Sequence, residues 1–380
     1  MTNKKIIFRP MDQEVAILAE SHANRAEAVL EVLIELQKRH GWVNQQQLED
    51  VGRVLHIPAE KVYGIATFYS LIETQPAPKN TIRVCDGPVC WLCGEHEVRE
   101  SVEKTFADHP GWRVERTSCL GLCDRAPAGL VNDQLAGPIS FEKVGELEKV
   151  WRGQPRDYSK PRPGELRVML ANLGSINPDA IESAVAHNIY QGLAAAFAHS
   201  PAEVVSEVEA SGLTGRGGAG FPVGRKWRFV AQAVRTQKYI ICNADEGEPG
   251  TFKDRVLMQE HPELMIEGMI FAAYAVGASK GAIYLRAEYM YLKDPIEKLL
   301  KKYRENGFLG KNIPAKTTFE FDMFVHLGAG AYVCGEETAL ISSMEGKRGE
   351  PGTKEFFPVQ KGFKGKPTVV NNVETLCTVP

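Results

Sequence analysis

Five of the eight cysteines in this sequence lie within residues 85–123. Four residues separate Cys85 from Cys90 and three separate Cys119 from Cys123, and each pair follows a stretch with the apolar pattern of a buried strand. Two adjacent loops would then deliver four thiolates, which suits a tetrahedral metal site or a [2Fe–2S] centre, where each iron takes two thiolates. The spacing predicts a metal or redox centre in this part of the chain.

Zinc is the alternative metal at these cysteines. Cys90 and Cys93, with two residues between them, would combine with Cys119 and Cys123 into a four-cysteine site whose C-x2-C spacing is frequent in zinc proteins. Some of the thiols could instead be buried without a metal. The spacing favours iron–sulfur over zinc and leaves both open. An absorbance spectrum of protein purified without oxygen separates them, because zinc sites are colourless.

A second chemically suggestive stretch is "GLTGRGGAGFPVGRKW", residues 212–227, which holds six glycines. Gly215, Gly217 and Gly220 have the spacing G-x-G-x-x-G and precede a predicted helix, so backbone N–H groups and the helix N-terminus can face an anion such as a phosphate. The preceding "SEVEASGL" is predicted to be helix and turn rather than strand. This departure from the dinucleotide-binding fingerprint argues against ordinary Rossmann binding of NAD or FAD.

Three further segments carry residues suited to a ligand pocket. Residues 242–255 end a predicted strand with small and acidic residues, and 328–349 place a glycine-rich turn before a helix that starts near Glu336 and Glu337. Carboxylates at a helix start complement its dipole and can accept from hydroxyl or amide donors. The two adjacent asparagines within 367–376 can pair with a heteroaromatic ring edge or a phosphate. Together with the glycine loop, these segments predict one ligand site.

Helices and strands must hold the cysteine loops in place. Apolar residues at helical spacing predict an N-terminal helical unit, with helices at 24–40, at 44–56 and from Pro58 onward. The cysteine loops would end two strands, with a helix at 94–109 between them. Three prolines and two glycines in 153–165 indicate an interdomain linker.

The remainder of the chain alternates between strands and helices, which is typical of an α/β domain with a largely parallel sheet. The predicted strands lie in "KYIICNAD", "GAIYLRAE" and "FEFDMFVHLGAG", and the predicted helices at 179–198, 201–210, 222–234, 254–277 and 289–306.

Composition bounds the class of protein. The 380 residues allow two or three domains, and 43% hydrophobic with 24% charged residues is ordinary for a globular protein. A net charge of −3 argues against a large nucleic-acid footprint. The N-terminus shows no signal peptide, and the longest apolar stretch, 265–278, is too short to span a bilayer and contains Glu267. We therefore expect a cytoplasmic protein without direct membrane insertion.

The motifs "CDGPVC" and "CLGLCDRAPA", with the preceding helices, resemble the thioredoxin-like [2Fe–2S] subunit of respiratory complex I over about residues 24–150. The resemblance implies that the cluster ligands are Cys85, Cys90, Cys119 and Cys123. Cys93 would then have no ligand role.

About residues 180–380 resemble the flavin-binding subunit of complex I and its relatives in soluble NAD-reducing hydrogenases and NAD-dependent formate dehydrogenases, through the glycine loop, "CNADEGEPGTFKDR", "GAGAYVCGEETALISSMEGKRG" and "PTVVNNVETL". The resemblance implies a Rossmann-like domain that binds FMN and leaves the flavin face open for a nicotinamide. It implies FMN contacts from Gly215, Arg216, Gly217, Lys226, Asn243, Asp245, Glu246, Tyr332, Gly335, Glu336, Asn371, Asn372 and Thr375. It implies NADH contacts from Phe221, Phe229, Glu248, Glu337, Lys354 and Phe357, with Glu337 positioning the nicotinamide at the catalytic site.

The chemistry of these residues suits the implied ligands. Lys226 and the loop N–H groups can neutralise the FMN phosphate. Three aromatic side chains, those of Phe221, Phe229 and Phe357, can stack on the nucleotide rings, each good contact contributing roughly 1 kcal/mol beyond burial. Five nearby acids would repel a 2′-phosphate, which predicts NAD rather than NADP; they are Asp245, Glu246, Glu248, Glu336 and Glu337.

These expectations combine into an α/β architecture with four parts. They are a helical unit (1–78), a thioredoxin-like [2Fe–2S] domain (79–152), a linker (153–178) and a Rossmann-like FMN/NAD(H)-binding domain (179–380). The fusion of both modules resembles the diaphorase subunit of a soluble NAD-reducing hydrogenase, which transfers hydride between NADH and FMN and single electrons to or from iron–sulfur centres.

Several alternatives stay open for the function. The catalytic partner would be a hydrogenase, with an iron–sulfur electron-transfer subunit, or a formate dehydrogenase; complex I and an electron-bifurcating complex also use such modules. A redox-inactive docking module is the alternative of another class. In the family a [4Fe–4S] domain follows the flavin domain, and Cys377 alone cannot form that site. The chain is therefore expected to be truncated, or to pass its electrons by another route.

Overall fold

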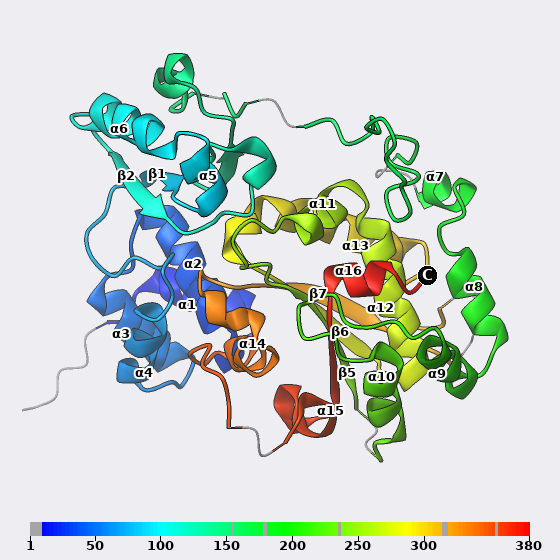
Figure 1. Cartoon of the computed structure of the whole chain (residues 1–380). Helices are drawn as coiled ribbons and strands as arrows, with labels where there is room; N and C mark the ends of the chain where they lie inside the picture. The colour runs from blue at the N-terminus through cyan, green and yellow to red at the C-terminus, as the bar shows by residue number, and fades with distance from the viewer. Residues whose placement is uncertain are drawn as a thin grey trace, which may run out of the picture.

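The computed structural model describes residues 10–149, 151–153, 156–177, 181–234, 237–313, 318–353 and 356–380 (Figure 1). The N-terminal helical unit consists of α1 (Gln13–Ser21), a 3-10 turn η1 (Ala26–Ala28), α2 (Val29–His40), α3 (Gln45–Val54) and α4 (Ala59–Ala66). Gly41 ends α2 in a left-handed conformation (φ 86°), and a reciprocal capping box of Asn44 and Gln47 begins α3. The three helices predicted here are confirmed, and α1 was not predicted.

The cysteine-containing domain has a four-stranded sheet in the order β2-β1-β3-β4. Strand β1 (Asn80–Cys85) is parallel to β2 (Trp112–Thr117), whereas β3 (Gly129–Val131) is antiparallel to both β1 and β4 (Gln134–Ala136). The helices of this domain are α5 (Pro88–Leu92), α6 (Glu95–Phe106), η2 (Cys123–Arg125) and η3 (Phe141–Glu146). Both predicted strands and the helix between them are confirmed; β3 and β4 are additional.

The C-terminal domain is built on a fully parallel sheet in the order β7-β6-β5-β8. Its strands are β5 (Tyr239–Ala244), β6 (Lys280–Leu285), β7 (Asp322–Leu327) and β8 (Thr368–Asn372). The parallel sheet and its first three strands are confirmed as predicted. The fourth strand, β8, was missed.

Three predicted helices of this domain are interrupted. The helix predicted at 179–198, whose first two residues lie outside the described residues, is instead α7 (Ile181–Ala186) and α8 (Gln191–Ala198), because Asn188 and Tyr190 adopt positive φ. The helix predicted at 254–277 divides into α11 (Lys253–Glu260) and α12 (Pro262–Val276), because Pro262 has no N–H to continue the ladder. The helix predicted at 289–306 begins as the 3-10 segment η4 (Ala287–Leu292) before α13 (Lys293–Glu305).

The other helices frame the strand ends. Two match their predictions closely, α9 (Pro201–Ala210) and α10 (Val223–Gln232). The helix predicted after the second glycine-rich turn is α14 (Glu337–Met344), preceded by η5 (Tyr332–Gly335). Shorter elements complete the domain: α15 (Pro358–Lys361), η6 (Phe363–Gly365) and α16 (Val373–Cys377).

The N-terminal helical unit packs on the C-terminal domain, beside α14 (Figure 1). Apolar side chains of α1 to α4 belong to the same buried core as those of the β5–β8 sheet, whereas the cysteine domain has two small cores of its own. The Tyr69 hydroxyl donates to Ser343 Oγ (2.8 Å), and the Leu71 N–H donates to the Ala329 carbonyl (3.1 Å). No helix in the described part of the chain has both the length and the apolar character needed to cross a membrane.

Candidate redox site

The two cysteine loops meet at one edge of the small sheet. Cys85 ends β1 and Cys119 follows β2, and because these strands are parallel and adjacent their loops leave the sheet side by side. Cys85, Cys90 and Cys119 are buried, and Cys123, in η2, is half-buried. A Cβ at Gly87 would lie 3.1 Å from the Cβ of Cys119, so the first loop passes directly against the second. Cys93, by contrast, is exposed.

The sulfur spacing suits shared coordination of a metal. The Sγ atoms of Cys119 and Cys123 lie 3.7 Å apart. Two thiolates that bind one tetrahedral metal at about 2.3 Å each are separated by about 3.7 Å. In the described ranges, no three His, Cys, Asp or Glu side chains converge on a point suited to one metal ion. A [2Fe–2S] centre requires thiolates in pairs, one pair for each iron.

The four cysteines influence one another's ionisation. Contact with Cys123 and then with Cys85 lowers the pKa of Cys119, and contact with Cys85 lowers the pKa of Cys90. The same contacts, with Cys119 foremost, raise the pKa of Cys85 and of Cys123. The four sulfurs therefore lie close enough together to shift one another's pKa, as the ligands of one shared metal centre would.

A cavity of about 560 Å³ lies at the carboxyl ends of β5 and β8. Its walls come from the glycine loop, from the loop between β5 and α11, from η5 and from the end of β8. In open parallel sheets this edge is where ligands bind. The lining residues are Arg216, Gly217, Gly218, Asn243, Asp245, Glu246, Gly247, Glu248, Thr251, Lys253, Asp254, Tyr332, Val333, Gly335, Glu336 and Asn372.

Most of the residues predicted to contact FMN line this cavity. They are Arg216, Gly217, Asn243, Asp245, Glu246, Tyr332, Gly335, Glu336 and Asn372. Four others lie outside its lining: Gly215, Lys226, Asn371 and Thr375. Of these, Thr375 is buried and its hydroxyl accepts from the Arg216 N–H (2.8 Å), and Asn371 is buried and its Oδ1 accepts from the Trp227 indole (2.8 Å). Thr375 therefore supports the glycine loop, and Asn371 supports α10, which follows that loop.

The positive charges at the cavity differ from those predicted. The Lys226 ammonium donates to Glu337 Oε2 (3.2 Å) and to the Val370 carbonyl (3.0 Å), outside the cavity lining. The cations that line the cavity are Arg216 and Lys253. Lys253, which sequence analysis missed, lies 2.7 Å from Asp254 Oδ1 and 3.0 Å from Glu374 Oε2.

Among the described residues predicted to contact NADH, Glu248 is the one that lines this cavity. Its carboxylate accepts from the Tyr332 hydroxyl (2.7 Å). Phe221, Phe229 and Phe357 are exposed, with 41%, 43% and 60% of their surface accessible, so their rings are available for stacking. Lys354 lies outside the described residues.

Two acids of the cavity hold their protons unusually tightly. Burial raises the pKa of Asp245 to about 7, and burial together with the charge of Asp254 raises that of Glu246 to about 7. The carboxylate of Glu336, another acid of the cavity, caps α14. It accepts from the N–H groups of Thr338 and Ala339 at 2.9 and 3.0 Å.

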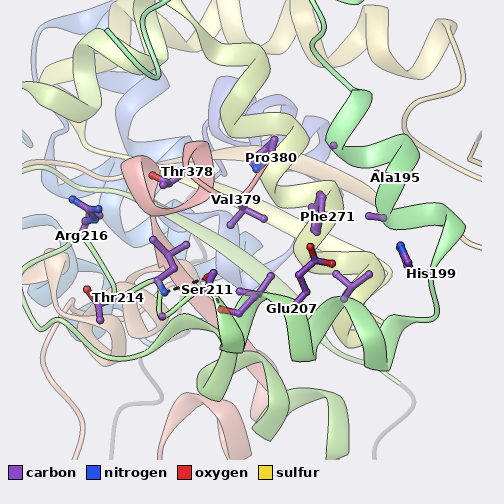
Figure 2. A pocket seen from close by; sticks show the side chains of 16 residues that line it. Ala195, His199, Glu207, Ser211, Thr214, Arg216, Phe271, Thr378, Val379 and Pro380 are labelled. Atoms are coloured by element: carbon purple, nitrogen blue, oxygen red, sulfur yellow. Dashed lines mark hydrogen bonds between the residues drawn. The ribbon is translucent and has the colours of Figure 1, made fainter. Parts of the chain in front are cut away.

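A second cavity, of about 600 Å³, lies beside the glycine loop, which contributes Thr214 and Arg216 to its lining (Figure 2). Glu207 and Ser211 approach it from α9 and its C-terminal end, and Phe271 from α12, while Thr378, Val379 and Pro380 close another wall. Arg216 lines both cavities. Among the described residues predicted to bind a cofactor, Arg216 is the one that lines this second cavity.

The second cysteine loop touches the wall of the first cavity. The backbone of Gly250, in the loop that lines that cavity, lies close enough to the sulfurs of Cys119 and Cys123 to act on the pKa of both thiols. Tyr289 packs against Gly121 so closely that a Cβ there would collide with its hydroxyl, and the same hydroxyl donates to Glu246 Oε2 (2.9 Å). The cysteine cluster and the cavity are therefore directly adjacent.

Two family descriptions match the chain. The thioredoxin-like [2Fe–2S] ferredoxin family matches residues 15–151, and the Nuo51 FMN-binding domain matches residues 208–380. The two matches cover the cysteine cluster and the first cavity, respectively.

Similar proteins include subunits of hydrogenases and of a quinone reductase. The alpha subunit of the NAD-reducing hydrogenase HoxS of Cupriavidus necator is 36% identical over 97% of this chain and 64% of its own length. The NADP-reducing hydrogenase subunit HndC of Solidesulfovibrio fructosivorans is 50% identical over 57% of this chain and 44% of its own. A component of the NADH-quinone oxidoreductase of Aquifex aeolicus is 49% identical over 60% of this chain and 52% of its own.

A solved structure shows the same arrangement of elements. A chain of the NAD+-reducing [NiFe]-hydrogenase in the H2-reduced state superposes with a TM-score of 0.76 at 34% identity, covering 94% of this chain and 60% of that one. The present chain thus spans less than two thirds of the length of these relatives.

Proposed function

We propose that this chain is the NAD(H)-oxidising and -reducing (diaphorase) subunit of a multisubunit redox complex. The reason is that it joins a domain of the thioredoxin-like [2Fe–2S] ferredoxin family to a Nuo51 FMN-binding domain. Hydride would pass between NAD(H) and FMN, and electrons would pass singly between FMN and iron–sulfur centres. The observation that supports this most directly is the contact of Tyr289 with both sites. Its ring packs against Gly121 in the second cysteine loop, and its hydroxyl donates to Oε2 of Glu246, which lines the cavity (2.9 Å).

FMN would occupy the cavity at the ends of β5 and β8. The flavin supplies two-electron exchange with the nicotinamide and one-electron exchange with the iron–sulfur centre. Backbone N–H groups of the glycine loop would bind the phosphate, with Arg216 and Lys253 as the neutralising cations that line the cavity. Asn243 and Asn372 offer amide groups to the flavin ring or its ribityl chain. The proposed contacts remain the thirteen predicted from the sequence, to which we add Lys253.

The iron–sulfur centre would be held by Cys85, Cys90, Cys119 and Cys123. The burial of Cys85, Cys90 and Cys119 supports this assignment, as do the mutual pKa effects of the thiols and the 3.7 Å between the sulfurs of Cys119 and Cys123. The exposed Cys93 would take no part. We keep the proposed boundaries at 1–78, 79–152, 153–178 and 179–380, with the first part packing on the last.

The nicotinamide nucleotide would approach from the open side of the cavity. Phe221, Phe229 and Phe357 would stack on its rings, and Glu248, Glu337 and Lys354 would bind its polar groups. We propose NAD(H) over NADP(H), because the acids around the cavity would repel a 2′-phosphate. Because this chain is also similar to a subunit of an NADP-reducing hydrogenase, the preference is tested by measuring turnover with both nucleotides. Equal efficiency with NADPH would contradict it.

The catalytic partner we propose is a hydrogenase, with an iron–sulfur electron-transfer subunit between the two. The relative aligned over 97% of this chain is a hydrogenase subunit, and so is the superposed structure. The same module in a formate dehydrogenase or in complex I is the second candidate, favoured by the similarity to the NADH-quinone oxidoreductase of Aquifex aeolicus. A cytoplasmic location is part of the proposal.

The test is anaerobic purification of the complex that contains this chain. FMN, iron and acid-labile sulfide are quantified, and NAD reduction is then measured with hydrogen and with formate as alternative donors. One FMN and two labile sulfides for each copy of this chain, after subtraction of the partners' content, are expected, with hydrogen as the effective donor. Protein that lacks FMN and cannot be reconstituted with it would refute the proposal.

A further inference from the structure

One guanidinium lies between the cysteine cluster and the cavity. Arg286 directly follows β6 and is only 6% exposed. Its Nη2 donates to the carbonyl of Cys119 (3.0 Å), and its Nη1 donates to the carbonyl of Glu246. The first acceptor belongs to the cysteine loop and the second to the wall of the flavin cavity.

The surroundings of Arg286 fix its position. Glu288 accepts from Nε (3.1 Å) and pairs with Nη2 (2.9 Å), so the buried charge is compensated. The Tyr289 ring packs beneath the guanidinium, with 5.1 Å between Cζ and the ring centroid. The planar fork of an arginine can serve several acceptors at once, whereas a lysine ammonium is a point charge that cannot reproduce this pattern.

We propose that Arg286 is a positioning residue shared by the two redox sites, fixing the Cys119 carbonyl and the Glu246 carbonyl together. This inference rests on the proposed function, because it concerns how the two bound cofactors are held relative to one another. Loss of the Arg286 guanidinium moves both loops. A single substitution at this residue therefore changes both the iron–sulfur centre and the flavin site. Removal of the positive charge also makes the added electron on the iron–sulfur centre less stable.

Arg255 provides a matched comparison. It is also a buried arginine, and its Nε donates to the Gly121 carbonyl (3.0 Å) while its Nη2 pairs with Asp124 (2.5 Å). Its side chain therefore holds the same cysteine loop without donating to the Glu246 carbonyl. A substitution at Arg255 is expected to affect the iron–sulfur centre alone, and one at Arg286 to affect both sites.

The experiment compares wild type, R286Q, R286K and R255K as the full chain in its complex. Redox titration followed by electron paramagnetic resonance reports the iron–sulfur centre, and FMN release on dilution reports the flavin site. R286Q is expected to decrease the ratio of reduced to oxidised centre about tenfold at a fixed potential, equivalent to about 59 mV for one electron. Its FMN dissociation constant is expected to rise about tenfold. R286K should recover most of the potential but not the FMN affinity.

R255K should alter the resonance spectrum and leave FMN affinity within twofold of wild type. A second variant, E288Q, removes the counter-ion of Arg286 and should shift both readouts in the same direction by smaller amounts. Unchanged readouts in folded R286Q and R286K would overturn the proposal, and so would an equal loss of FMN in R255K. Failure of R286K and E288Q to fold while R255K folds would also overturn it, because Arg286 would then serve folding alone. Wild-type protein without FMN or cluster would instead refute the proposed function.

Discussion

Lys226 and Glu337, predicted for the flavin phosphate and the nicotinamide respectively, form an ion pair with Nζ and Oε2 3.2 Å apart. Their side chains are 19% and 31% exposed, so the pair is partly shielded from water. The two residues come from α10 and from the first position of α14, and they tie together the helices that follow the two glycine-rich turns. A change at either residue therefore also releases the other.

This pair leads to a prediction about nucleotide binding. Glu337→Gln removes a charge and frees Lys226, and we expect the KM for NADH to rise about tenfold, equivalent to about 1.4 kcal/mol. FMN content should stay at the wild-type level. The control is Glu345→Gln, which breaks an ion pair with Lys347 just after the same helix. Steady-state kinetics with unchanged KM in E337Q, or with the same change in E345Q, would count against the role of Glu337.

Gly121 offers a test of the contact between the two domains. Its φ of 66° favours glycine, and an added Cβ would collide with the Tyr289 hydroxyl. Gly111, in the same domain, has a φ of 80° but open space around its Cβ position. Gly111→Ala is expected to decrease the free energy of unfolding by about 1–2 kcal/mol through backbone strain. Gly121→Ala should cost a further 1–3 kcal/mol or so through overpacking.

Denaturant unfolding of both alanine variants measures the difference. The colour and resonance spectrum of the iron–sulfur centre should change only in G121A, because Gly121 lies between two proposed ligands. Equal destabilisation of the two variants would show that Tyr289 yields to the added methyl group, contrary to expectation.

The half-buried acid Asp245 predicts a pH dependence of stability. Burial raises its pKa to about 7 from an ordinary value of 3.8. The folded protein therefore keeps a proton that the unfolded chain releases, and the stabilising contribution is complete below about pH 4 and is lost as the pH rises through 7. Asp245→Asn removes this contribution. We expect the stability of wild type relative to D245N to fall between pH 4 and 7, measured by urea unfolding of FMN-free protein; parallel curves would contradict the assignment.

Two ion pairs join the helical unit to the C-terminal domain, and they differ in burial. His326 Nδ1 in β7 lies 3.1 Å from Glu31 Oε1 in α2, with the histidine side chain 3% exposed. Lys364 pairs with Glu27, and both side chains are substantially exposed. Glu31→Gln should lower the free energy of unfolding by about 1–3 kcal/mol, because a buried group loses its charged partner. Lys364→Met should cost less than about 1 kcal/mol. Chemical denaturation of both variants checks this order.

Sequence patterns predicted the elements that have a clear apolar run or a clear apolar periodicity. The runs in β5, β6 and β7 and the periodicity of α9 and α10 were sufficient, and the two cysteine pairs indicated a shared site. Strand β8 was not predicted because "TVVNN" is short and its two asparagines are unfavourable in strands. The break between α11 and α12 does have a sequence signal, because Pro262 cannot continue the hydrogen-bond ladder. The left-handed conformation of Tyr190 has no such signal, because packing rather than a glycine imposes it.

The candidate site, too, was predicted in part from the sequence. The resemblance located most of the cavity lining, because motifs preserve the order of small and acidic residues along the chain. Lys253 was missed because a single basic side chain among acids has no characteristic spacing. Arg286 could not be predicted at all, since its acceptor on Cys119 is 167 positions away and only the folded chain brings them together.

The shared core of the N-terminal helices and the distant β5–β8 sheet has a consequence for biosynthesis. A ribosome releases the apolar surfaces of α1 to α4 well before it has made the partners that cover them, whereas the intervening cysteine domain can close its own small cores immediately. The second cysteine loop, however, gains its contacts with Arg255 and Arg286 only after the C-terminal domain has been made. The nascent helices would meanwhile need a chaperone to prevent aggregation until α14 emerges.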